Sequence, residues 1–190
     1  MKYWLGIDTS AYTTSVAAAG ADGPVLDLRK LLNTPKGQKG LRQSDAFYQH
    51  WQNLPGLLSQ VFEEFRGKIE GVCVSEKPRP AEGSYMPVFN AGVQAALTAA
   101  AALGIPVYKT THQEGHISAA AWGTSIDLKK PLIFAHLSGG TLELVHYHEG
   151  AADIVGAAKD ISYGQLLDRF GVDMGFPFPA GKYIDELALS

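Results

Sequence analysis

The sequence predicts an α/β protein with two related lobes, and two observations support that prediction. The first is an N-terminal run of three strands, at Tyr3–Asp8, Thr13–Ala19 and Val25–Leu32, whose short connections are typical of an antiparallel sheet. The second is the alternation of strands with helices further along, which ends in a hairpin and a helix that repeat the first pattern. Elements that alternate in this way form a sheet covered by helices.

Periodicity places the elements after the first three strands. A helix begins near Ser44, with Ser44 or Asp45 as its N-cap, and Pro55 is expected to kink or break it. Its apolar positions form one core-facing stripe: Phe47, Trp51, Leu54, Leu57, Leu58, Val61, Phe62 and Phe65. Later strands are expected at Ile69–Ser75, Ile105–Tyr108, Leu132–Leu137 and Thr141–Tyr147. Later helices are expected at Val88–Leu103, from Thr110 or Thr111 to about Trp122, at Ser162–Phe170, and from Tyr183 onward.

The two predicted lobes differ in completeness. The first spans residues 1–110 and includes a connection at Asn33–Gly40, whose Gly, Pro and Lys residues predict an exposed or mobile link. The second spans residues 111–190 and begins with the helix that ends near Trp122, followed by one hairpin and one helix before another helix starts at Tyr183. Because a lobe of that size buries little of its own surface, we expect the chain to be a portion of a longer protein.

Composition excludes several classes of protein. Of the 190 residues, 46% are hydrophobic and 18% are charged, and the net charge is −3, which excludes a disordered chain. No run of Lys and Arg gives an electrostatic footprint for nucleic acid, so contact with a polyanion needs a local patch or a partner protein. The single cysteine, Cys73, predicts a reduced, cytoplasmic protein. The uncharged segment Gly83–Tyr108 contains Pro87 and Pro106, so we expect no membrane span.

The motif Thr111-His112-Gln113-Glu114-Gly115-His116 is the most informative local pattern. On a helix, His112 and His116 lie one turn apart on the same face, as the histidines of many metal sites do. The spacing is equally consistent with two polar side chains that face solvent. A zinc protease of the His-Glu-x-x-His type needs a glutamate directly after the first histidine, where this chain has Gln113. Glu114 lies about 200° around the helix from His112, which disfavours that class.

Three further polar clusters have binding chemistry, and each has a plain structural alternative. The turn Ser138-Gly139-Gly140 makes an anion-binding nest if its glycines adopt positive φ; the alternative is a tight hairpin turn. The turn at Asp8, Thr9 and Ser10 suits phosphate or hydrated Mg²⁺, and equally an ordinary polar turn. Asp168 and the turn at Gly181 suit a ribose and a stacked adenine; the alternative is a solvated carboxylate beside a structural turn.

In their order along the chain, these motifs resemble those of the universal tRNA threonylcarbamoyltransferase family, called TsaD in bacteria and formerly glycoprotease or O-sialoglycoprotein endopeptidase. The matching stretches are Gly6-Ile7-Asp8-Thr9-Ser10 with Thr14-Ser15-Val16-Ala17, His112–His116, Leu137-Ser138-Gly139-Gly140, Gly164–Asp168, and Pro179-Ala180-Gly181 with Ile184-Asp185. The resemblance runs through all 190 residues. It implies the actin-like (ASKHA) fold of two-lobed ATPases, with a ribonuclease H-like core, a complete first lobe and a partial second lobe.

The resemblance also implies a reaction, the transfer of a threonylcarbamoyl group from its AMP anhydride to N6 of adenosine 37 in tRNA. It assigns His112 and His116 to a divalent metal, iron or zinc, which would polarise the transferred group. It assigns the adenylate, threonylcarbamoyl-AMP or an ATP-like nucleotide, to Leu137, Ser138, Gly139, Gly140, Thr141, Asp168, Gly181 and Asp185. No catalytic residue beyond the metal site is implied. The implied partners are a paralogous ASKHA subunit and an ATPase subunit of the threonylcarbamoyladenosine complex, or a second copy bound through the first lobe, with tRNA reached through that complex.

The chain departs from the family pattern at several points. Ala11-Tyr12-Thr13 stands where the family has Cys-Asp-Glu, and Glu76–Pro80 stands where the family has a Gly-Pro-Gly loop. After Gly139-Gly140 the chain has Thr141 in place of the family's His-Thr pair, and Lys182 replaces the proline of the family's Gly-Gly-Pro turn. The family's third metal ligand, an aspartate far downstream, and a downstream asparagine that contacts adenine have no counterpart within the sequence. Two other functions stay open, a non-catalytic scaffold paralogue and the metallopeptidase of the old family name, which Gln113 disfavours.

Overall fold

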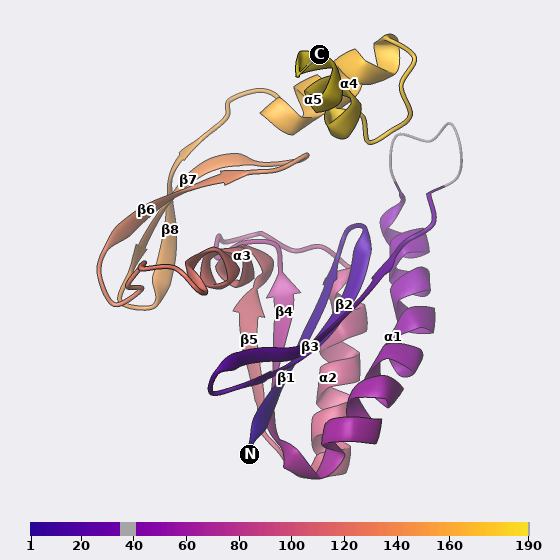
Figure 1. The fold of residues 1–190 in the computed structure, drawn as a ribbon, viewed down its shortest axis with the longest axis vertical. Helices are drawn as coiled ribbons and strands as arrows, with labels where there is room; N and C mark the ends of the chain where they lie inside the picture. Colours follow the sequence, from indigo (N-terminus) through magenta and orange to yellow (C-terminus); the bar gives the residue numbers. More distant parts are fainter. Residues whose placement is uncertain (35–40, 190) are drawn as a thin grey trace. The chain divides into compact units, whose positions relative to one another are not determined.

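The computed structural model describes residues 1–34 and 41–189, so most of the connection expected at Asn33–Gly40 lies outside the described residues. Two compact units make up the structure, Met1–His116 and Ile117–Ser190 (Figure 1). The boundary falls inside helix α3 (His112–Ala121), later than the border expected after residue 110. Both candidate metal ligands therefore belong to the first unit.

A five-stranded sheet forms the first unit, in the order β3-β2-β1-β4-β5. Its strands are β1 (Tyr3–Ser10), β2 (Thr13–Gly20), β3 (Gly23–Leu31), β4 (Ile69–Lys77) and β5 (Val107–Thr111). The first three form the predicted antiparallel trio, whereas β4 pairs in parallel with both β1 and β5. The carboxyl ends of β1, β4 and β5 therefore meet at one edge of the sheet, which is where ligands bind in open α/β sheets.

Helices α1 (Gln43–Phe65) and α2 (Phe89–Leu103) pack against each other and against the strands of this sheet (Figure 1). Side chains alternate along a strand, so Leu5 and Ile7 of β1 are buried while their neighbours are more exposed. The same core holds Val16, Ala18, Leu54, Val61, Val72, Val74 and Ala96. Helix α2 ends, as predicted, at Gly104, whose φ of 67° is the left-handed conformation that glycine adopts at low cost.

The start of α1 differs from the prediction. The helix begins at Gln43 and its N-cap residue is Arg42, which makes no side-chain capping hydrogen bond, so the predicted cap at Ser44 or Asp45 is wrong. Asp45 is instead in the first turn and forms an ion pair with Arg42 at 2.9 Å. A carboxylate in the first turn stabilises the helix through its dipole and does not need to be the capping residue.

The buried face of α1 also differs from the predicted stripe. Helix α1 continues unbroken through Pro55, because proline removes one helical hydrogen bond while the packing of the long apolar face on the sheet is kept. Trp51 is 61% exposed, and His50 beside it is fully buried. The rest of the predicted stripe is confirmed: Leu54, Leu57, Leu58, Val61 and Phe65 are buried, and Phe47 and Phe62 pack against the core. His50, and not Trp51, completes the inward face, which places an imidazole in the interior of the first unit.

A three-stranded antiparallel sheet, in the order β6-β7-β8, forms the second unit together with two helices. The elements are β6 (Leu132–Leu137), β7 (Leu142–His148), β8 (Ala151–Ala157), α4 (Tyr163–Asp173) and α5 (Gly181–Ala188). Strand β8 has no counterpart in the sequence prediction, because its alanines and glycine give little strand signal. It follows a turn in which Glu149 and Gly150 have φ of 50° and 81°, the two positive values that a tight hairpin turn requires.

The uncharged segment Gly83–Tyr108 folds as a loop, helix α2 and the start of β5. Across residues 1–34 and 41–189, no helix is long and apolar enough to cross a bilayer. Cys73 on β4 is half-buried, and burial, with a smaller effect of the Glu114 carboxylate, raises the pKa of its thiol. A thiol of that kind is protonated at neutral pH and unreactive.

Candidate metal centre and nucleotide pocket

A reciprocal capping box fixes the start of α3. The Thr111 N–H donates to Glu114 Oε2 at 2.8 Å, and the Glu114 N–H donates to Thr111 Oγ1 at 3.2 Å. The Thr110 hydroxyl donates to the same carboxylate oxygen at 3.0 Å. Of the two caps that the sequence allows, Thr111 is therefore the one used, and the carboxylate of Glu114 serves the helix start.

The two histidines of α3 point their Nε2 atoms at each other. The His112 Nε2 and His116 Nε2 atoms lie 2.9 Å apart, and the ring planes meet at 73°. Two nitrogens at that separation bind one ion with an angle of about 90° when each metal–nitrogen bond is about 2.0–2.1 Å long. The geometry therefore fits two adjacent ligands of a single divalent metal such as zinc or iron.

These two nitrogens make only part of a coordination shell. Within residues 1–34 and 41–189, no group of three or more His, Cys, Asp or Glu side chains is placed to hold a metal ion. The remaining positions on an ion bound to His112 and His116 would go to water, substrate or ligands from elsewhere.

Asp8, at the end of β1, supports the ring of His112 from behind. Its Oδ2 lies 2.8 Å from His112 Nδ1, on the side of the ring away from His116. Burial by itself raises the pKa of this carboxyl, but the hydrogen bond and charge of His112, with bonds from Ser75 and Ser10, outweigh it and lower the pKa to about 2. A carboxylate on the far nitrogen of a ligand histidine is the usual second layer of a metal site. Sequence analysis places Asp8 only in a polar turn and does not connect it with His112.

Asp8, Thr9 and Ser10, predicted as a turn, are instead the last three residues of β1, and the turn itself is Ala11 and Tyr12. The buried Thr9 Oγ1 donates to the Val88 carbonyl at 3.2 Å and accepts the Gly92 N–H at 3.1 Å, which ties β1 to the start of α2. A Cβ at Gly92 would lie 2.8 Å from Thr9 Oγ1, so a glycine is needed for this approach. The Ser10 N–H donates to Asp8 Oδ1 at 2.9 Å. The Ser10 N–H therefore holds the carboxylate of Asp8 in place, and the hydroxyl of Thr9 is used for packing inside the first unit.

In the second unit, the turn between β6 and β7 is held close to α4. Ser162, the N-cap of α4, donates its hydroxyl to the Gly139 carbonyl at 2.9 Å. A Cβ at Gly164 would lie 2.5 Å from Gly139 Cα, so the backbones touch at two glycines. Neither Gly139 nor Gly140 has positive φ, so the nest conformation considered from the sequence is not the one adopted. These glycines serve close packing instead of an unusual backbone conformation.

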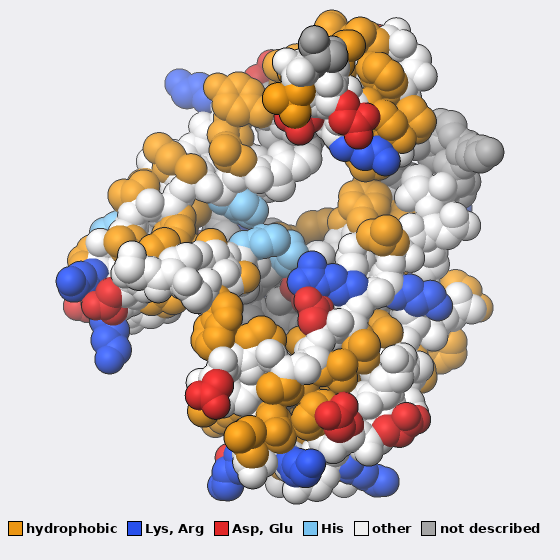
Figure 2. Space-filling view, viewed as in Figure 1, with side chains coloured by type: hydrophobic (Ala, Val, Ile, Leu, Met, Phe, Trp, Pro, Cys, Tyr) orange, Lys and Arg blue, Asp and Glu red, His pale blue; other side chains and the backbone are white. Residues whose placement is uncertain are grey.

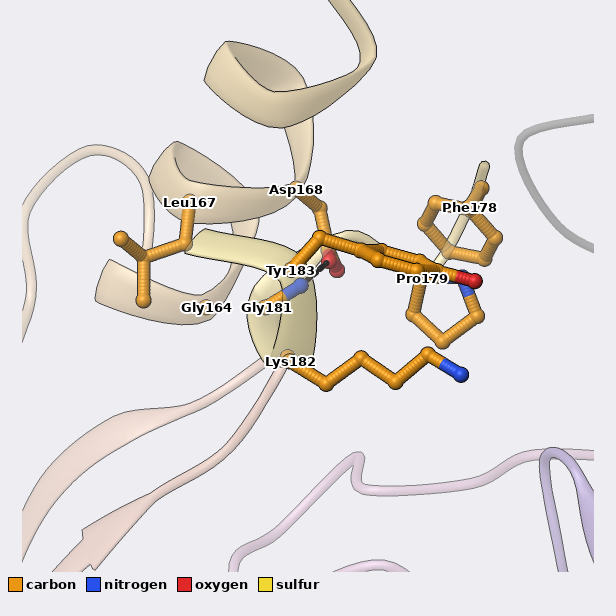
Figure 3. A pocket seen from close by; sticks show the side chains of 9 residues that line it. Gly164, Leu167, Asp168, Phe178, Pro179, Gly181, Lys182 and Tyr183 are labelled. Atoms are coloured by element: carbon orange, nitrogen blue, oxygen red, sulfur yellow. Dashed lines mark hydrogen bonds between the residues drawn. The ribbon is translucent and has the colours of Figure 1, made fainter. Parts of the chain in front are cut away.

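A cavity of about 460 Å³ lies beside this contact in the second unit, and it brings Gly139, Asp168 and Gly181 together (Figure 3). Asp168 Oδ1 accepts the Ala180 N–H at 2.7 Å and the Gly181 N–H at 3.3 Å, so the carboxylate caps the start of α5. The cavity is also lined by Gly164, Leu167, Phe178, Pro179, Lys182 and Tyr183. A carboxylate, a cation and aromatic rings around one cavity suit a nucleotide.

The other predicted nucleotide residues lie outside the lining of this cavity. Leu137 is the last residue of β6, Ser138, Gly140 and Thr141 belong to the turn that follows it, and Asp185 is on α5. Lys182 is a cavity residue that the sequence analysis noted only as a departure, where the family has proline. Its ammonium lies 4.6 Å from the centre of the Tyr183 ring, a cation–π contact.

The fold defines a class of protein. An antiparallel trio followed by two parallel strands and flanked by helices is the ribonuclease H-like core of the ASKHA proteins. Among solved structures, the chain is similar to the Lmo2764 protein of Listeria monocytogenes, a candidate N-acetylmannosamine kinase, with a TM-score of 0.50 and 16% identity over 85% of this chain and 53% of that one. The chain is thus an ASKHA-type α/β protein.

Within that class, the chain belongs to the TsaD family of tRNA N6-adenosine threonylcarbamoyltransferases, whose family model matches residues 30–190. The tRNA N6-adenosine threonylcarbamoyltransferase of Methanothrix thermoacetophila is 29% identical over 189 residues, or 98% of this chain and 55% of that protein. The enzyme of the same name from Streptococcus pneumoniae is 31% identical over 194 residues, with the same coverage. The chain therefore spans about half the length of these curated relatives.

Proposed function

We propose that this chain supplies the metal ligands and part of the adenylate pocket of a tRNA N6-adenosine threonylcarbamoyltransferase. The observation on which the proposal mainly depends is the pair of Nε2 atoms of His112 and His116, 2.9 Å apart on α3 and supported by Asp8. A scaffold protein without chemistry has no use for such a pair. Family membership supplies the substrate: threonylcarbamoyl-AMP as donor and N6 of adenosine 37 in tRNA as acceptor.

In the proposed reaction the N6 amine attacks the carbamoyl carbon, the bond from that carbon to the phosphate oxygen breaks, and AMP leaves while N6 loses a proton. A metal, iron or zinc, would act as a Lewis acid that stabilises the oxyanion formed at the carbamoyl oxygen. His112 and His116 would supply two of the ligands of that ion, and its other positions would be filled by water, substrate or further ligands. Asp8 keeps His112 in the orientation that the ion needs.

The cavity of the second unit provides the proposed adenylate contacts. The Asp168 Oδ2 atom is the carboxylate oxygen that α5 does not use, and it lies near Gly139, at 3.9 Å from an added Cβ there. A free carboxylate oxygen accepts hydrogen bonds from ribose hydroxyls. The Gly139–Gly164 contact leaves room for a flat base, and Lys182 contributes the positive charge that a phosphate requires.

Membership of the family implies the proposed partners, and the weak charge of the chain agrees with them. On the face drawn in Figure 2, Lys and Arg side chains are scattered among acidic ones and form no continuous basic surface. With a net charge of −3, the chain would reach tRNA through a complex in the cytoplasm. That complex would contain a paralogous ASKHA subunit and an ATPase subunit, or a second copy bound through the first unit.

The structure gives no support to the peptidase function of the old family name. That function needs a glutamate next to the first histidine as general base. Gln113 occupies this position and is buried, with 1% of its surface exposed. Glu114 is engaged in the capping box with Thr111.

A transfer assay tests the proposed function. The chain is incubated with threonylcarbamoyl-AMP labelled in its threonine and with an adenosine-37 tRNA transcript, alone and with the paralogous and ATPase subunits. Because the chain carries two metal ligands and only part of the adenylate pocket, we expect it to be incomplete for turnover and to transfer no label alone. With the other subunits present we expect label in the tRNA and release of AMP, and we expect His112→Ala to abolish this transfer while the labelled adenylate still binds. Transfer that is equal for His112→Ala and wild type contradicts the proposal. If the wild type and His112→Ala stimulate a transferase on another chain equally, the scaffold function would be favoured instead.

A further inference from the structure

Two sets of hydrogen bonds, joined through the backbone of Ser10, connect α1 to the histidine pair. The Asn53 amide donates to Thr14 Oγ1 at 3.1 Å, and Thr14 Oγ1 lies 2.8 Å from His50 Nδ1. His50 Nε2 lies 2.8 Å from the Ser10 carbonyl oxygen. On the other side of Ser10, its N–H donates to Asp8 Oδ1, and Asp8 Oδ2 lies 2.8 Å from His112 Nδ1. His50 and Thr14 are both fully buried, so the hydrogen bond between them forms without competition from water.

The chemistry of the partners fixes the tautomer of His50. A backbone carbonyl can only accept a hydrogen bond, so His50 Nε2 must carry the proton that goes to Ser10. The other ring nitrogen, Nδ1, is then an acceptor and takes the hydroxyl proton of Thr14. Burial lowers the pKa of His50, which agrees with a neutral ring. The backbone of Ser10 is therefore held on both sides of its Cα atom, at its carbonyl by His50 and at its N–H by Asp8.

The same reasoning applies to His112, with the opposite tautomer. A carboxylate has no proton to donate, so both oxygens of Asp8 accept: Oδ1 from the Ser10 N–H and Oδ2 from the His112 Nδ1–H. With its proton on Nδ1, His112 has a lone pair on Nε2, the atom that lies 2.9 Å from His116 Nε2. A metal needs that lone pair.

We infer that Asp8 is the positioning residue of the metal site and holds His112 in the Nδ1–H tautomer before any ion binds. His50 in turn anchors Asp8 through the backbone of Ser10, by its bond to the Ser10 carbonyl. This inference rests on the proposed function, because it takes His112 and His116 as ligands. It assigns Asp8 a role that differs from the phosphate turn considered from the sequence. The sequence separation of 104 residues between Asp8 and His112 places this contact beyond any local motif.

Asp8→Asn is the most informative variant, since it keeps the shape of the side chain. The amide oxygen of the new residue has to take the Ser10 N–H, because an amide nitrogen cannot accept a hydrogen bond. Its NH₂ group then faces His112 Nδ1, which must become an acceptor. The ring proton moves to Nε2, and the lone pair that a metal needs is lost. The same exchange of carboxylate for amide produces a wrong histidine tautomer in catalytic triads.

The tautomers are measured by two-bond ¹⁵N–¹H correlation NMR on the metal-free, ¹⁵N-histidine-labelled chain above pH 7. We expect His112 with its proton on Nδ1 and His50 with its proton on Nε2 in the wild type. In Asp8→Asn the proton of His112 should move to Nε2, and His50 should not change. Asp153→Asn is the matched control, because Asp153 Oδ2 lies 2.8 Å from His148 Nε2 in the second unit. It should alter His148 alone.

The second measurement is Co²⁺ affinity by absorbance titration, in a His146→Ala/His148→Ala background. This background removes the adjacent histidine rings of β7, whose centres lie 4.7 Å apart. We expect Asp8→Asn to weaken Co²⁺ binding by about 10–100-fold, the range for supporting residues of metal ligands. A wild-type His112 with its proton on Nε2, or an unchanged tautomer and affinity in folded Asp8→Asn, overturns the inference. Absence of Co²⁺ binding by the wild type contradicts the proposed metal site, while the NMR result still decides the role of Asp8.

Discussion

Gly164 at the start of α4 touches the backbone of Gly139, with no space for a side chain between them. An added Cβ at Gly164 would lie 2.5 Å from both Gly139 Cα and the Ser138 carbonyl oxygen. Ser162, two residues before Gly164, donates a hydrogen bond from its hydroxyl to the Gly139 carbonyl. The turn that the family assigns to the adenylate is thus positioned by packing against a helix N-terminus.

This contact predicts that Gly164→Ala destabilises the second unit. Backbone atoms cannot move aside as a flexible side chain can, so we expect a cost of about 1–3 kcal/mol, typical of overpacking. Amide hydrogen exchange of the segment 132–170, followed by mass spectrometry, measures the loss. Gly140→Ala is the matched control, since an added Cβ there meets no atom within 4 Å. Equal exchange rates in the two variants would show that the glycine contact is not required.

The carboxyl group of Asp8 predicts an acid-dependent loss of stability. Its pKa in the folded chain is about 2, against a usual value of 3.8. The native state therefore binds fewer protons than the unfolded state between these values. The stabilisation is complete above pH 3.8 and disappears as the pH falls towards 2, and it amounts to about 2 kcal/mol.

Urea unfolding at a series of pH values between 5 and 2 measures this effect. Wild type should lose more stability over that range than Asp8→Asn, because the amide does not titrate. Asp153→Asn removes a carboxylate whose side chain is 66% exposed, and it should leave the pH profile unchanged. A profile for Asp8→Asn that follows the wild type would mean that Asp8 is not held in its ionised form.

Lys182 predicts a preference for nucleotides that carry phosphate. It lines the same cavity as Asp168 and is the one cation among the lining residues of that cavity (Figure 3). Removing an exposed ion pair costs up to about 1 kcal/mol, so Lys182→Gln should weaken AMP binding about fivefold. Adenosine should bind equally well to both proteins, and Lys182→Arg should keep most of the affinity. Isothermal titration measures each constant, and an equal loss for AMP and adenosine would assign Lys182 to the base or ribose instead.

Local patterns predicted the antiparallel trio and the β6–β7 hairpin well, because alternating strands joined by short turns are determined by neighbouring residues. Strand β8 escaped prediction since its alanines and glycine pack beside β7 without a distinctive pattern of their own. The start of α1 was placed incorrectly because Asp45 is a good capping residue, whereas the backbone begins the helix at Gln43. Trp51 was assigned to the core by its hydrophobicity, and the structure places His50 there.

For the candidate site, contacts within one helix can be predicted from the sequence, whereas contacts between residues far apart in the sequence cannot. The spacing of His112 and His116 predicts their shared face, and the Thr111-x-x-Glu114 pattern is a capping-box signature that sequence analysis had within reach. The support of His112 by Asp8 arises only when β1 and β5 end at the same sheet edge. Polar residues at the carboxyl ends of parallel strands are the signal that could have found it.

Metal stoichiometry tests the central claim most directly. The chain is loaded with Zn²⁺ or Fe²⁺ in the His146→Ala/His148→Ala background, passed through a desalting column without oxygen, and analysed by inductively coupled plasma mass spectrometry. We predict one ion for each chain with His112 and His116 intact, and none after His112→Ala or His116→Ala. Equal metal content in all three proteins would contradict the assignment of this histidine pair as the metal ligands.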